Sequence, residues 1–116
     1  MADLNLVEEA RKVFDIEIES LQKVRDELDG NFAVLVKGIL ACQGRIVLTG
    51  IGKSGHIAKK IAATMSSLGT PAYYLHPAEG AHGDLGVVTK DDIVLAISYS
   101  GETDEIIQLI PSIKKI

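Results

Sequence analysis

The sequence predicts an α/β fold built on a parallel β-sheet. Three apolar runs with strand character, at residues 45–49, 72–75 and 93–97, are separated by segments with helical periodicity. This alternation of strand and helix favours a parallel sheet with right-handed crossover connections. The run at 93–97 is continuously apolar, which is typical of a strand covered on both faces.

Composition and charge narrow the class of protein. With 116 residues, the chain is long enough for one small domain with its own core. The formal net charge of −4 gives no overall attraction for nucleic acid, so no nucleic-acid partner is expected. The single cysteine, Cys42, excludes an internal disulfide. Because the sequence has neither a signal peptide nor an apolar run of about 18 residues, we expect a cytoplasmic protein without a membrane partner.

The first 44 residues are predicted to form two helices. Residues 5–28 have helical periodicity, and their apolar side chains fall on one face: Val7, Phe14, Ile18, Leu21 and Leu28. Such a helix would be roughly 36 Å long, longer than a small domain is wide, so we expect part of its apolar face to pack on another subunit. Asn31 can cap a second helix that Gly44 ends. We therefore predict an N-terminal helical segment at 1–44, packing on the domain and on a neighbouring subunit, and an α/β domain over 45–116.

A glycine-rich turn follows the first predicted strand. Gly50, Gly52 and Gly55 are spaced Gly-x-Gly-x-x-Gly, and a helix is expected to follow over 56–68. Glycines let the backbone approach a bound group, and the helix start directs unpaired N–H groups at it, which favours phosphate. Lys53 and Ser54 lie in the turn and add an ammonium and a hydroxyl, although a solvated lysine and a helix-capping serine would look the same. In the helix, Ile57, Ala58, Ile61, Ala62, Met65 and Leu68 are expected to face the core.

Two other phosphate-binding classes fit this turn less well. A dinucleotide-binding module requires an acidic residue at the end of the second strand, where this sequence has His76. A nucleoside-triphosphatase loop requires a glycine five residues before Gly52, and that position holds Val47. We therefore exclude a triphosphatase and retain a dinucleotide module only as a weak alternative.

A second polar turn follows the third predicted strand. Ser98, Ser100, Gly101 and Thr103 come directly after that strand and before the last helix. Hydroxyls in such a turn often serve only the turn itself. Because the carboxyl ends of parallel strands share one edge of the sheet, where ligands bind, we expect these hydroxyls to form a phosphate clamp with the first turn. The last helix is expected to begin near Thr103, and Pro111 is expected to kink or end it.

Ionisable residues near this edge supply candidates for chemistry. Residues 76–88 are predicted to form a polar, glycine-rich loop, and long loops inside compact domains are usually functional. His76 and His82 stand six positions apart with no helix to fix them, which is a weak signal for a metal site. His82 instead suits acid/base chemistry or a contact with substrate hydroxyls. Glu105 lies at the start of the last helix, where complementing the helix dipole is the simpler explanation.

Taken together, these segments resemble a known family. The segments are Gly52–Gly55, 62–72, His76-Pro-Ala-Glu79, His82-Gly-Asp-Leu-Gly86 and Ser98-Tyr-Ser-Gly-Glu-Thr103. They are similar to the sugar-isomerase (SIS) domain, and within it to the D-arabinose-5-phosphate isomerase family. The resemblance covers essentially the whole chain and implies a doubly wound, flavodoxin-like sheet of strand order 2-1-3-4-5, of which this chain carries the first three strands. Gly80 departs from the family pattern, which usually has alanine there. Family members also continue with two more strands, further helices and commonly a pair of CBS modules, which are not in this chain, and neither are a glutamate and a histidine of their second half.

The resemblance also implies a function. Such enzymes interconvert D-arabinose 5-phosphate and D-ribulose 5-phosphate, and we expect the reaction to pass through a cis-enediol without a cofactor or a metal. Gly52, Ser54, Ser98, Ser100, Gly101 and Thr103 are the expected phosphate-binding residues. Lys53 is expected to stabilise the enediolate, Glu105 to act as acid/base, and His82 to contact the sugar hydroxyls or help to open the ring.

The family suggests a cytoplasmic homotetramer with a place in lipopolysaccharide synthesis. A non-catalytic sugar-phosphate sensor with the same fold is the alternative. Such a sensor would be marked by a basic helix-turn-helix before the domain, and the acidic N-terminal helix does not provide one.

Overall fold

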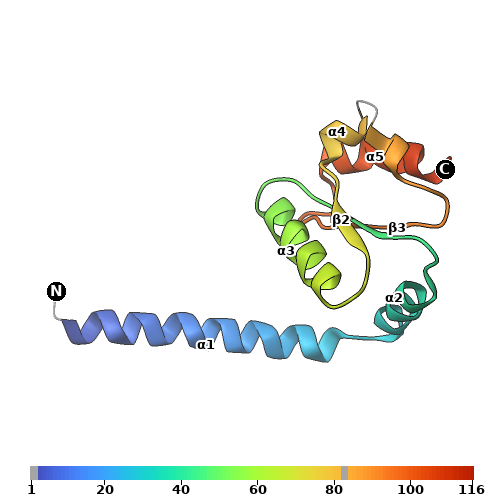
Figure 1. Cartoon of the computed structure of the whole chain (residues 1–116). Helices are drawn as coiled ribbons and strands as arrows, with labels where there is room; N and C mark the ends of the chain where they lie inside the picture. The colour runs from blue at the N-terminus through green and yellow to red at the C-terminus, as the bar shows by residue number, and fades with distance from the viewer. Residues whose placement is uncertain (1–2, 82–83) are drawn as a thin grey trace. The chain divides into compact units, whose positions relative to one another are not determined.

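The structure, a computed structural model, describes residues 3–81 and 84–116 (Figure 1). Its elements follow the order α1 (Asp3–Glu27), α2 (Gly30–Ala41), β1 (Ile46–Thr49), α3 (Lys53–Ser67), β2 (Ala72–Tyr74), α4 (Pro77–Ala81), the 3₁₀ helix η1 (Asp84–Val87), β3 (Ile93–Ala96) and α5 (Asp104–Lys114). The chain divides into two compact units, residues 1–37 and 38–116. The domain boundary predicted after residue 44 stays a prediction.

The two predicted N-terminal helices are present. The first begins two residues earlier than predicted, at Asp3. The second begins at Gly30, because the Asp29 carboxylate accepts a hydrogen bond from the Asn31 backbone N–H at 2.9 Å. Asp29, rather than Asn31, is therefore the residue whose side chain serves the helix start.

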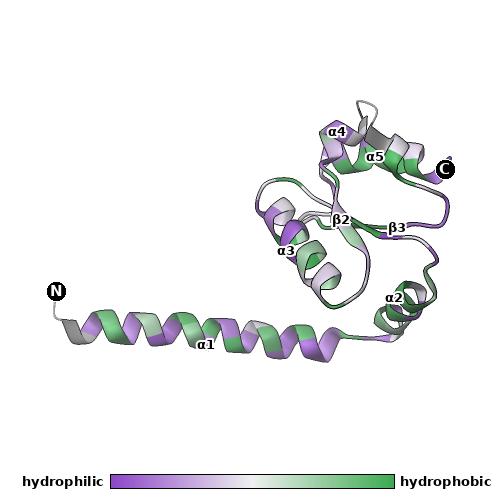
Figure 2. Ribbon diagram, viewed as in Figure 1, coloured by the Kyte–Doolittle hydropathy of each residue, from purple (hydrophilic) through white to green (hydrophobic). Residues whose placement is uncertain are grey.

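The predicted apolar face of α1 is exposed in the structure. Its large hydrophobic side chains include Leu6, Val7, Phe14, Ile18, Leu21, Val24 and Leu28, all exposed. Figure 2 shows hydrophobic and hydrophilic residues interleaved along the whole helix. The short ion pair between Arg11 and Glu8 at 2.7 Å lies on the polar surface and contributes little stability there. That the apolar face packs on another subunit remains a prediction. None of the helices in the described part of the chain is long and apolar enough to cross a membrane.

The second unit is built on a three-stranded parallel sheet of order β2-β1-β3, which confirms the predicted fold class. In register, Ile46 of β1 pairs with Ala72 of β2 and with Ile93 of β3. Every residue of β1 is buried, as expected for a central strand with helices on both faces. The β3 strand is at the edge of the sheet, and its last residue, Ala96, is exposed.

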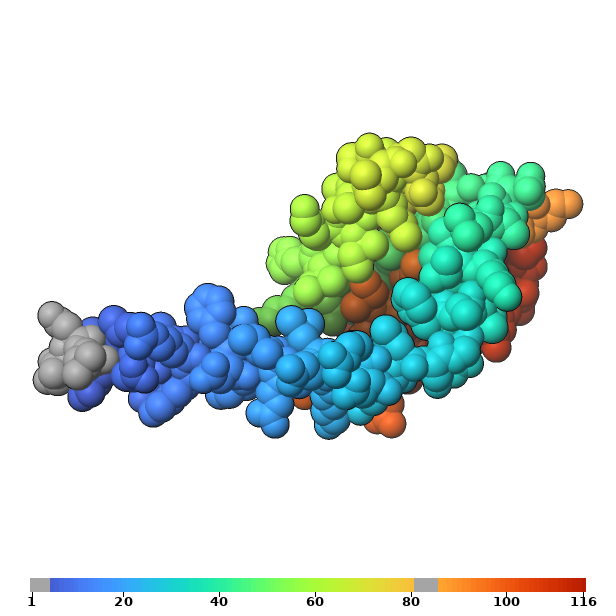
Figure 3. Space-filling model, turned by 90° about the horizontal axis from the view of Figure 1, so that it is seen from below, coloured from blue at the N-terminus to red at the C-terminus, as the bar shows by residue number. Residues whose placement is uncertain are grey.

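Alternate residues of β1 face two separate layers of helices. Ile46 and Leu48 pack on Ala58 and Ala62 of α3, whereas Val47 packs with Leu75 and Val88 on the opposite face. Figure 3 shows atoms of α3, coloured light green to yellow, beside orange atoms of the segment around β3. The α5 helix buries Ile106 and Leu109, and these two side chains line a cavity with Thr49, Val94 and Ala96. Helices on both faces make the sheet doubly wound, as the resemblance implied.

Two local predictions were wrong, and a third is decided only in part. The segment 76–88 is not a continuous loop, since it contains α4 and η1. Two residues predicted to face the core, Ile57 and Leu68, are 55% and 79% exposed. Pro111 does not end the last helix, which continues to Lys114, and the alternative that Pro111 kinks the helix stays a prediction.

Candidate functional site

The turn between β1 and α3 has the geometry of an anion site. Gly52 is the residue before the helix and has φ 62°, a left-handed conformation that glycine adopts without strain. Among the described residues, no side chain caps this helix start. The first backbone N–H groups of α3 therefore have no side-chain acceptor within that part of the chain, and they carry the positive end of the helix dipole. Phosphate is a natural ligand for such a group of donors.

The base of this turn is packed without spare room. A methyl group at Gly55 would lie 2.7 Å from the Gly50 carbonyl oxygen and 3.1 Å from the Tyr74 hydroxyl. The Tyr74 hydroxyl itself donates a hydrogen bond to the Gly50 oxygen at 2.6 Å. Burial, together with the negative charge of Glu79, raises the pKa of Tyr74, so the hydroxyl keeps its proton. Tyr74 was not singled out from the sequence, where it reads as an ordinary apolar strand residue.

The second turn is closed by its own hydroxyls. Ser98 Oγ lies 2.8 Å from Thr103 Oγ1 and accepts a hydrogen bond from the Gly101 N–H at 3.0 Å. Ser100 Oγ accepts a hydrogen bond from the Glu102 N–H at 3.1 Å. Gly101 has φ 72°, which the turn needs and glycine supplies. In this structure the hydroxyls are therefore hydrogen-bonded within the turn itself.

The two turns line one shallow cleft of about 360 Å³ at the carboxyl ends of β1 and β3. Lys53 and Ser54 from α3 face it from one side, and Ser98 from the segment after β3 faces it from the other. Its remaining lining residues, Ile57, Ile97 and Tyr99, were not predicted to be in the site. The sequence carries no signal that marks Ile57 for the cleft, because helical periodicity assigns this residue to the core. A lysine, two hydroxyls and a helix start around one cleft suit a small anionic ligand.

The other predicted site residues differ in how they relate to this cleft. Thr103 precedes α5 and its hydroxyl pairs with Ser98, so it belongs to the same turn. Glu105 is exposed in the first turn of α5 and does not line the cleft. His82 lies outside the described residues. The roles predicted for Glu105 and His82 stay predictions.

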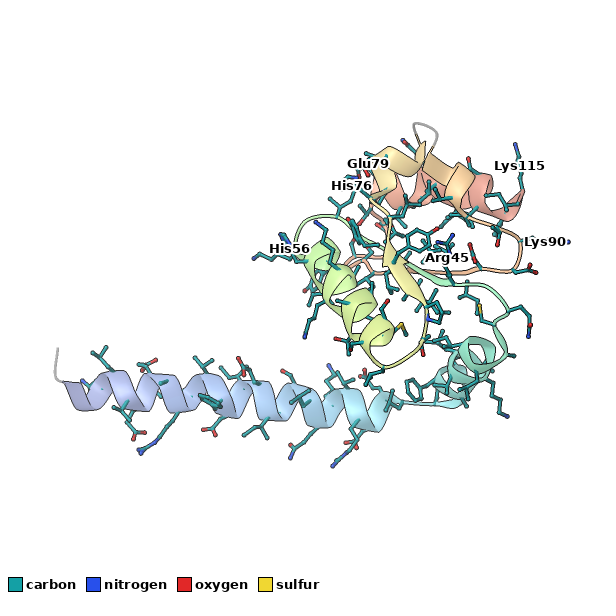
Figure 4. The ribbon with its side chains drawn as sticks, in the orientation of Figure 1. Arg45, His56, His76, Glu79, Lys90 and Lys115 are labelled. Atoms are coloured by element: carbon teal, nitrogen blue, oxygen red, sulfur yellow. The ribbon has the colours of Figure 1, made fainter. Side chains whose placement is uncertain are left out.

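The end of β2 brings further ionisable groups to the same edge of the sheet. His76 Nδ1 accepts a hydrogen bond from the Ala78 N–H at 3.1 Å, which in the neutral ring leaves the proton on Nε2. Figure 4 shows His76 and Glu79 next to each other at α4, with His56 on the neighbouring α3. Within the described residues, no group of three His, Cys, Asp or Glu side chains is arranged to hold a metal ion.

The opposite edge of the sheet holds the segment after β2 in place. The carbonyl oxygen of Val87, at the end of η1, accepts hydrogen bonds from the Arg45 guanidinium at 3.0 Å and the Tyr73 hydroxyl at 3.3 Å. The Arg45 guanidinium also lies 4.5 Å from the centre of the Tyr73 ring. The Asp92 carboxylate accepts hydrogen bonds from the N–H groups of Arg45 at 2.7 Å and Thr89 at 2.8 Å. These contacts are structural, since they lie away from the cleft.

Fold and site together define an α/β protein with two polar, glycine-containing turns at the carboxyl edge of a parallel sheet. The family model described as "SIS domain" matches residues 39–115. The chain belongs to the SIS domain family.

Individual relatives are similar over nearly the whole chain. The arabinose 5-phosphate isomerase KdsD of Pseudomonas aeruginosa is 44% identical over 114 residues, which are 98% of this chain and 35% of that protein. A solved structure from E. coli CFT073, described as a complex with arabinose 5-phosphate, is 45% identical with a TM-score of 0.93, covering 99% of this chain and 61% of that one. A putative sugar-phosphate isomerase from Listeria monocytogenes is 31% identical with a TM-score of 0.92, again covering 99% and 61%. The chain spans about a third of the length of the curated relatives it matches.

Proposed function

We propose that this protein is an aldose–ketose isomerase that interconverts D-arabinose 5-phosphate and D-ribulose 5-phosphate. The observation that carries the proposal is the cleft in which Lys53, Ser54 and Ser98 meet at the carboxyl edge of the sheet. It is supported by the names of the relatives, which are arabinose 5-phosphate isomerases, and by the solved complex of a similar protein with arabinose 5-phosphate.

The phosphate of the substrate binds between the two turns. The N–H groups at the start of α3 and the hydroxyl of Ser54 bind it from one side. Ser98, Ser100 and Thr103 bind it from the other, after the Ser98–Thr103 hydrogen bond and the bond from the Glu102 N–H to Ser100 give way to phosphate oxygens. Gly52 and Gly101, both with positive φ, let the backbone approach the ligand closely. Holding the phosphate fixes the far end of the sugar and so positions its reacting carbons.

The chemistry is a proton transfer between adjacent carbons. A base removes the proton from C2 of arabinose 5-phosphate, which leaves a cis-enediolate, and return of a proton to C1 yields ribulose 5-phosphate. Lys53, exposed in the cleft, supplies the positive charge that stabilises the enediolate oxygen. Glu105 is our proposed acid/base and His82 the proposed contact to the sugar hydroxyls. Because no electrons leave the sugar, the reaction needs no cofactor.

We further propose that the protein works as a cytoplasmic homotetramer that supplies a sugar phosphate for lipopolysaccharide synthesis. The exposed apolar face of α1, with Phe14, Ile18 and Leu21, supports assembly, since a helix of this kind gains most of its stability by packing on another surface.

Substitution of Lys53 tests the proposal. Lys53→Ala is expected to lower kcat for arabinose 5-phosphate by about a hundredfold or more, the usual effect of removing one group that stabilises a developing oxyanion. Lys60→Ala is the matched control, because Lys60 is also an exposed lysine of α3 but does not line the cleft. Wild-type kcat in the Lys53 variant would overturn the role of Lys53.

Isotope exchange tests the path of the proton and separates the alternative function. In deuterated water an enediol path places solvent deuterium on C2 of arabinose 5-phosphate, which NMR detects directly. Interconversion without deuterium uptake would contradict the enediol. Binding of sugar phosphates with no interconversion at all would favour a non-catalytic sensor.

A further inference from the structure

Tyr74 connects the edge strand of the sheet to the anion-binding turn. Its ring packs with the α3 side of the core, and its hydroxyl donates to the carbonyl oxygen of Gly50 at 2.6 Å. Gly50 is buried and is the first residue of the turn after β1. A side chain from β2 therefore holds the backbone at the point where the chain leaves β1 for α3.

The contact tolerates little displacement. Gly55, in the first turn of α3, approaches the same carbonyl so closely that an added methyl group would lie 2.7 Å from its oxygen and 3.1 Å from the Tyr74 hydroxyl. The Gly50 oxygen, Gly55 and the hydroxyl thus form one close contact beneath the turn. The opposite side of the turn is open, since Gly52 and Lys53 are exposed.

Two further groups fix the orientation of the Tyr74 ring. Lys59 Nζ lies 5.0 Å from the centre of the ring. The ring of His76 meets it edge-on, at 6.5 Å between centres and 77° between planes. The position of the Tyr74 hydroxyl is therefore restricted, because its ring has neighbours on more than one side.

We propose that Tyr74 is a positioning residue for the phosphate site: its hydroxyl sets the conformation of Gly50–Gly55 in which the N–H groups of α3 point at the ligand. The inference rests on the function proposed above, because it assigns that ligand as the phosphate of the substrate. Without the hydroxyl, the buried Gly50 carbonyl loses its donor, and the turn rotates or opens to water to satisfy it. Donors that are no longer preset for the ligand bind it less tightly.

The test compares Tyr74→Phe with Tyr73→Phe. Tyr73 is the adjacent residue on the opposite face of β2, and its hydroxyl also donates to a backbone carbonyl, that of Val87 at 3.3 Å. Each variant loses one hydroxyl and one hydrogen bond, but only Tyr74 contacts the turn. We would measure calorimetric dissociation constants for inorganic phosphate and D-arabinose 5-phosphate, and amide hydrogen exchange at Gly52–Gly55.

Tyr74→Phe is expected to weaken both ligands by a similar factor, roughly five- to tenfold, because they share the phosphate group. Exchange at Gly52–Gly55 should become faster, whereas Tyr73→Phe should leave both dissociation constants within about twofold of the wild type. A rise in KM for arabinose 5-phosphate with a smaller change in kcat would accompany the weaker binding.

The possible failures are distinguishable. Wild-type affinity and exchange in Tyr74→Phe would overturn the positioning role and leave the isomerase proposal standing. Equal losses in the two variants would also overturn it, since the effect would then be one of general stability. If the unsubstituted protein binds neither ligand, the proposed function falls, and hydrogen exchange alone decides whether Tyr74 holds the turn.

Discussion

Gly55 offers the most direct test of how the turn between β1 and α3 is packed. An alanine methyl at this position would lie 2.7 Å from the Gly50 carbonyl oxygen and 3.1 Å from the Tyr74 hydroxyl. Since one of these neighbours is backbone, the methyl group cannot be accommodated by moving a flexible side chain. Gly55→Ala is therefore expected to displace the turn between β1 and α3.

The magnitude follows from two opposing contributions. Overpacking a buried site costs about 1–3 kcal/mol, and a contact with backbone is at the upper end of that range. Replacing glycine by alanine within a helix stabilises it by about 1 kcal/mol. The net destabilisation is about 1–2 kcal/mol, which lowers the thermal midpoint by roughly 10 °C for a unit of this size.

Gly38→Ala is the matched control. Gly38 lies within α2, in the same compact unit, and a methyl group there would meet only Ile93 Cδ1 at 3.9 Å, an ordinary contact. This variant keeps the helix benefit without the clash, so it should be slightly more stable than the wild type. Thermal unfolding and phosphate titration of the two variants give the comparison. A Gly55→Ala protein as stable as Gly38→Ala would refute the packing described for the turn.

Two further predictions concern single side chains of the sheet and the segments next to it. Partial burial would raise the pKa of the Asp92 carboxyl, but the N–H donors of Arg45 and Thr89 and the charge of Arg45 outweigh it and hold that pKa below its ordinary value of 3.8. A pKa lowered by folding stabilises the protein above the unfolded-state pKa, and this stabilisation is lost as the pH falls through the native pKa. Urea midpoints measured from about pH 6 to about pH 3 should therefore fall less steeply in Asp92→Asn, and parallel slopes would contradict the assignment. Thr49 is 1% exposed, and among the described residues its hydroxyl has no hydrogen-bond partner. Thr49→Val should be neutral or stabilising by up to about 1 kcal/mol in chemical denaturation, and a clear loss of stability would indicate that the hydroxyl has a partner.

The periodic parts of the fold were predictable from the sequence because their signals are local. The apolar run that includes Ile46 to Thr49 and the run at 93–97 were predictable as strands, and their alternation with helices indicates a parallel sheet. Of the two, β1 is fully buried, whereas β3 lies at the edge of the sheet and its residues are half-buried or exposed. The alanines of α3 mark its contact with the sheet, and Ala58 and Ala62 are indeed buried there. Ile57 could not be assigned in the same way, since periodicity predicts the apolar face of a helix but not how much of that face a neighbour covers.

The position of the two turns at one edge of the sheet was predictable, whereas the contacts that hold them were not. Gly52, Lys53 and Ser98 predict an anion site by residue type and by position after a strand, and that role stays a prediction. Tyr74 carries no such signal, because its role depends on which carbonyl lies opposite its hydroxyl across two strands. The short helices at 77–81 and 84–87 were missed since neither contains enough residues for helical periodicity to appear.

Gly50 explains why two turns distant in sequence form one site. A methyl group there would lie 3.0 Å from the carbonyl oxygen of Ile97 in the second turn and 3.0 Å from that of Ser54 in the first. The Ile97 N–H also donates to the Thr49 carbonyl at 2.9 Å, which continues the hydrogen bonding between β1 and β3 one residue beyond the end of β3. A side chain at position 50 would press on the backbone of both turns at once, and at least one of them would have to move. The close approach of the two turns therefore depends on the absence of a side chain at Gly50.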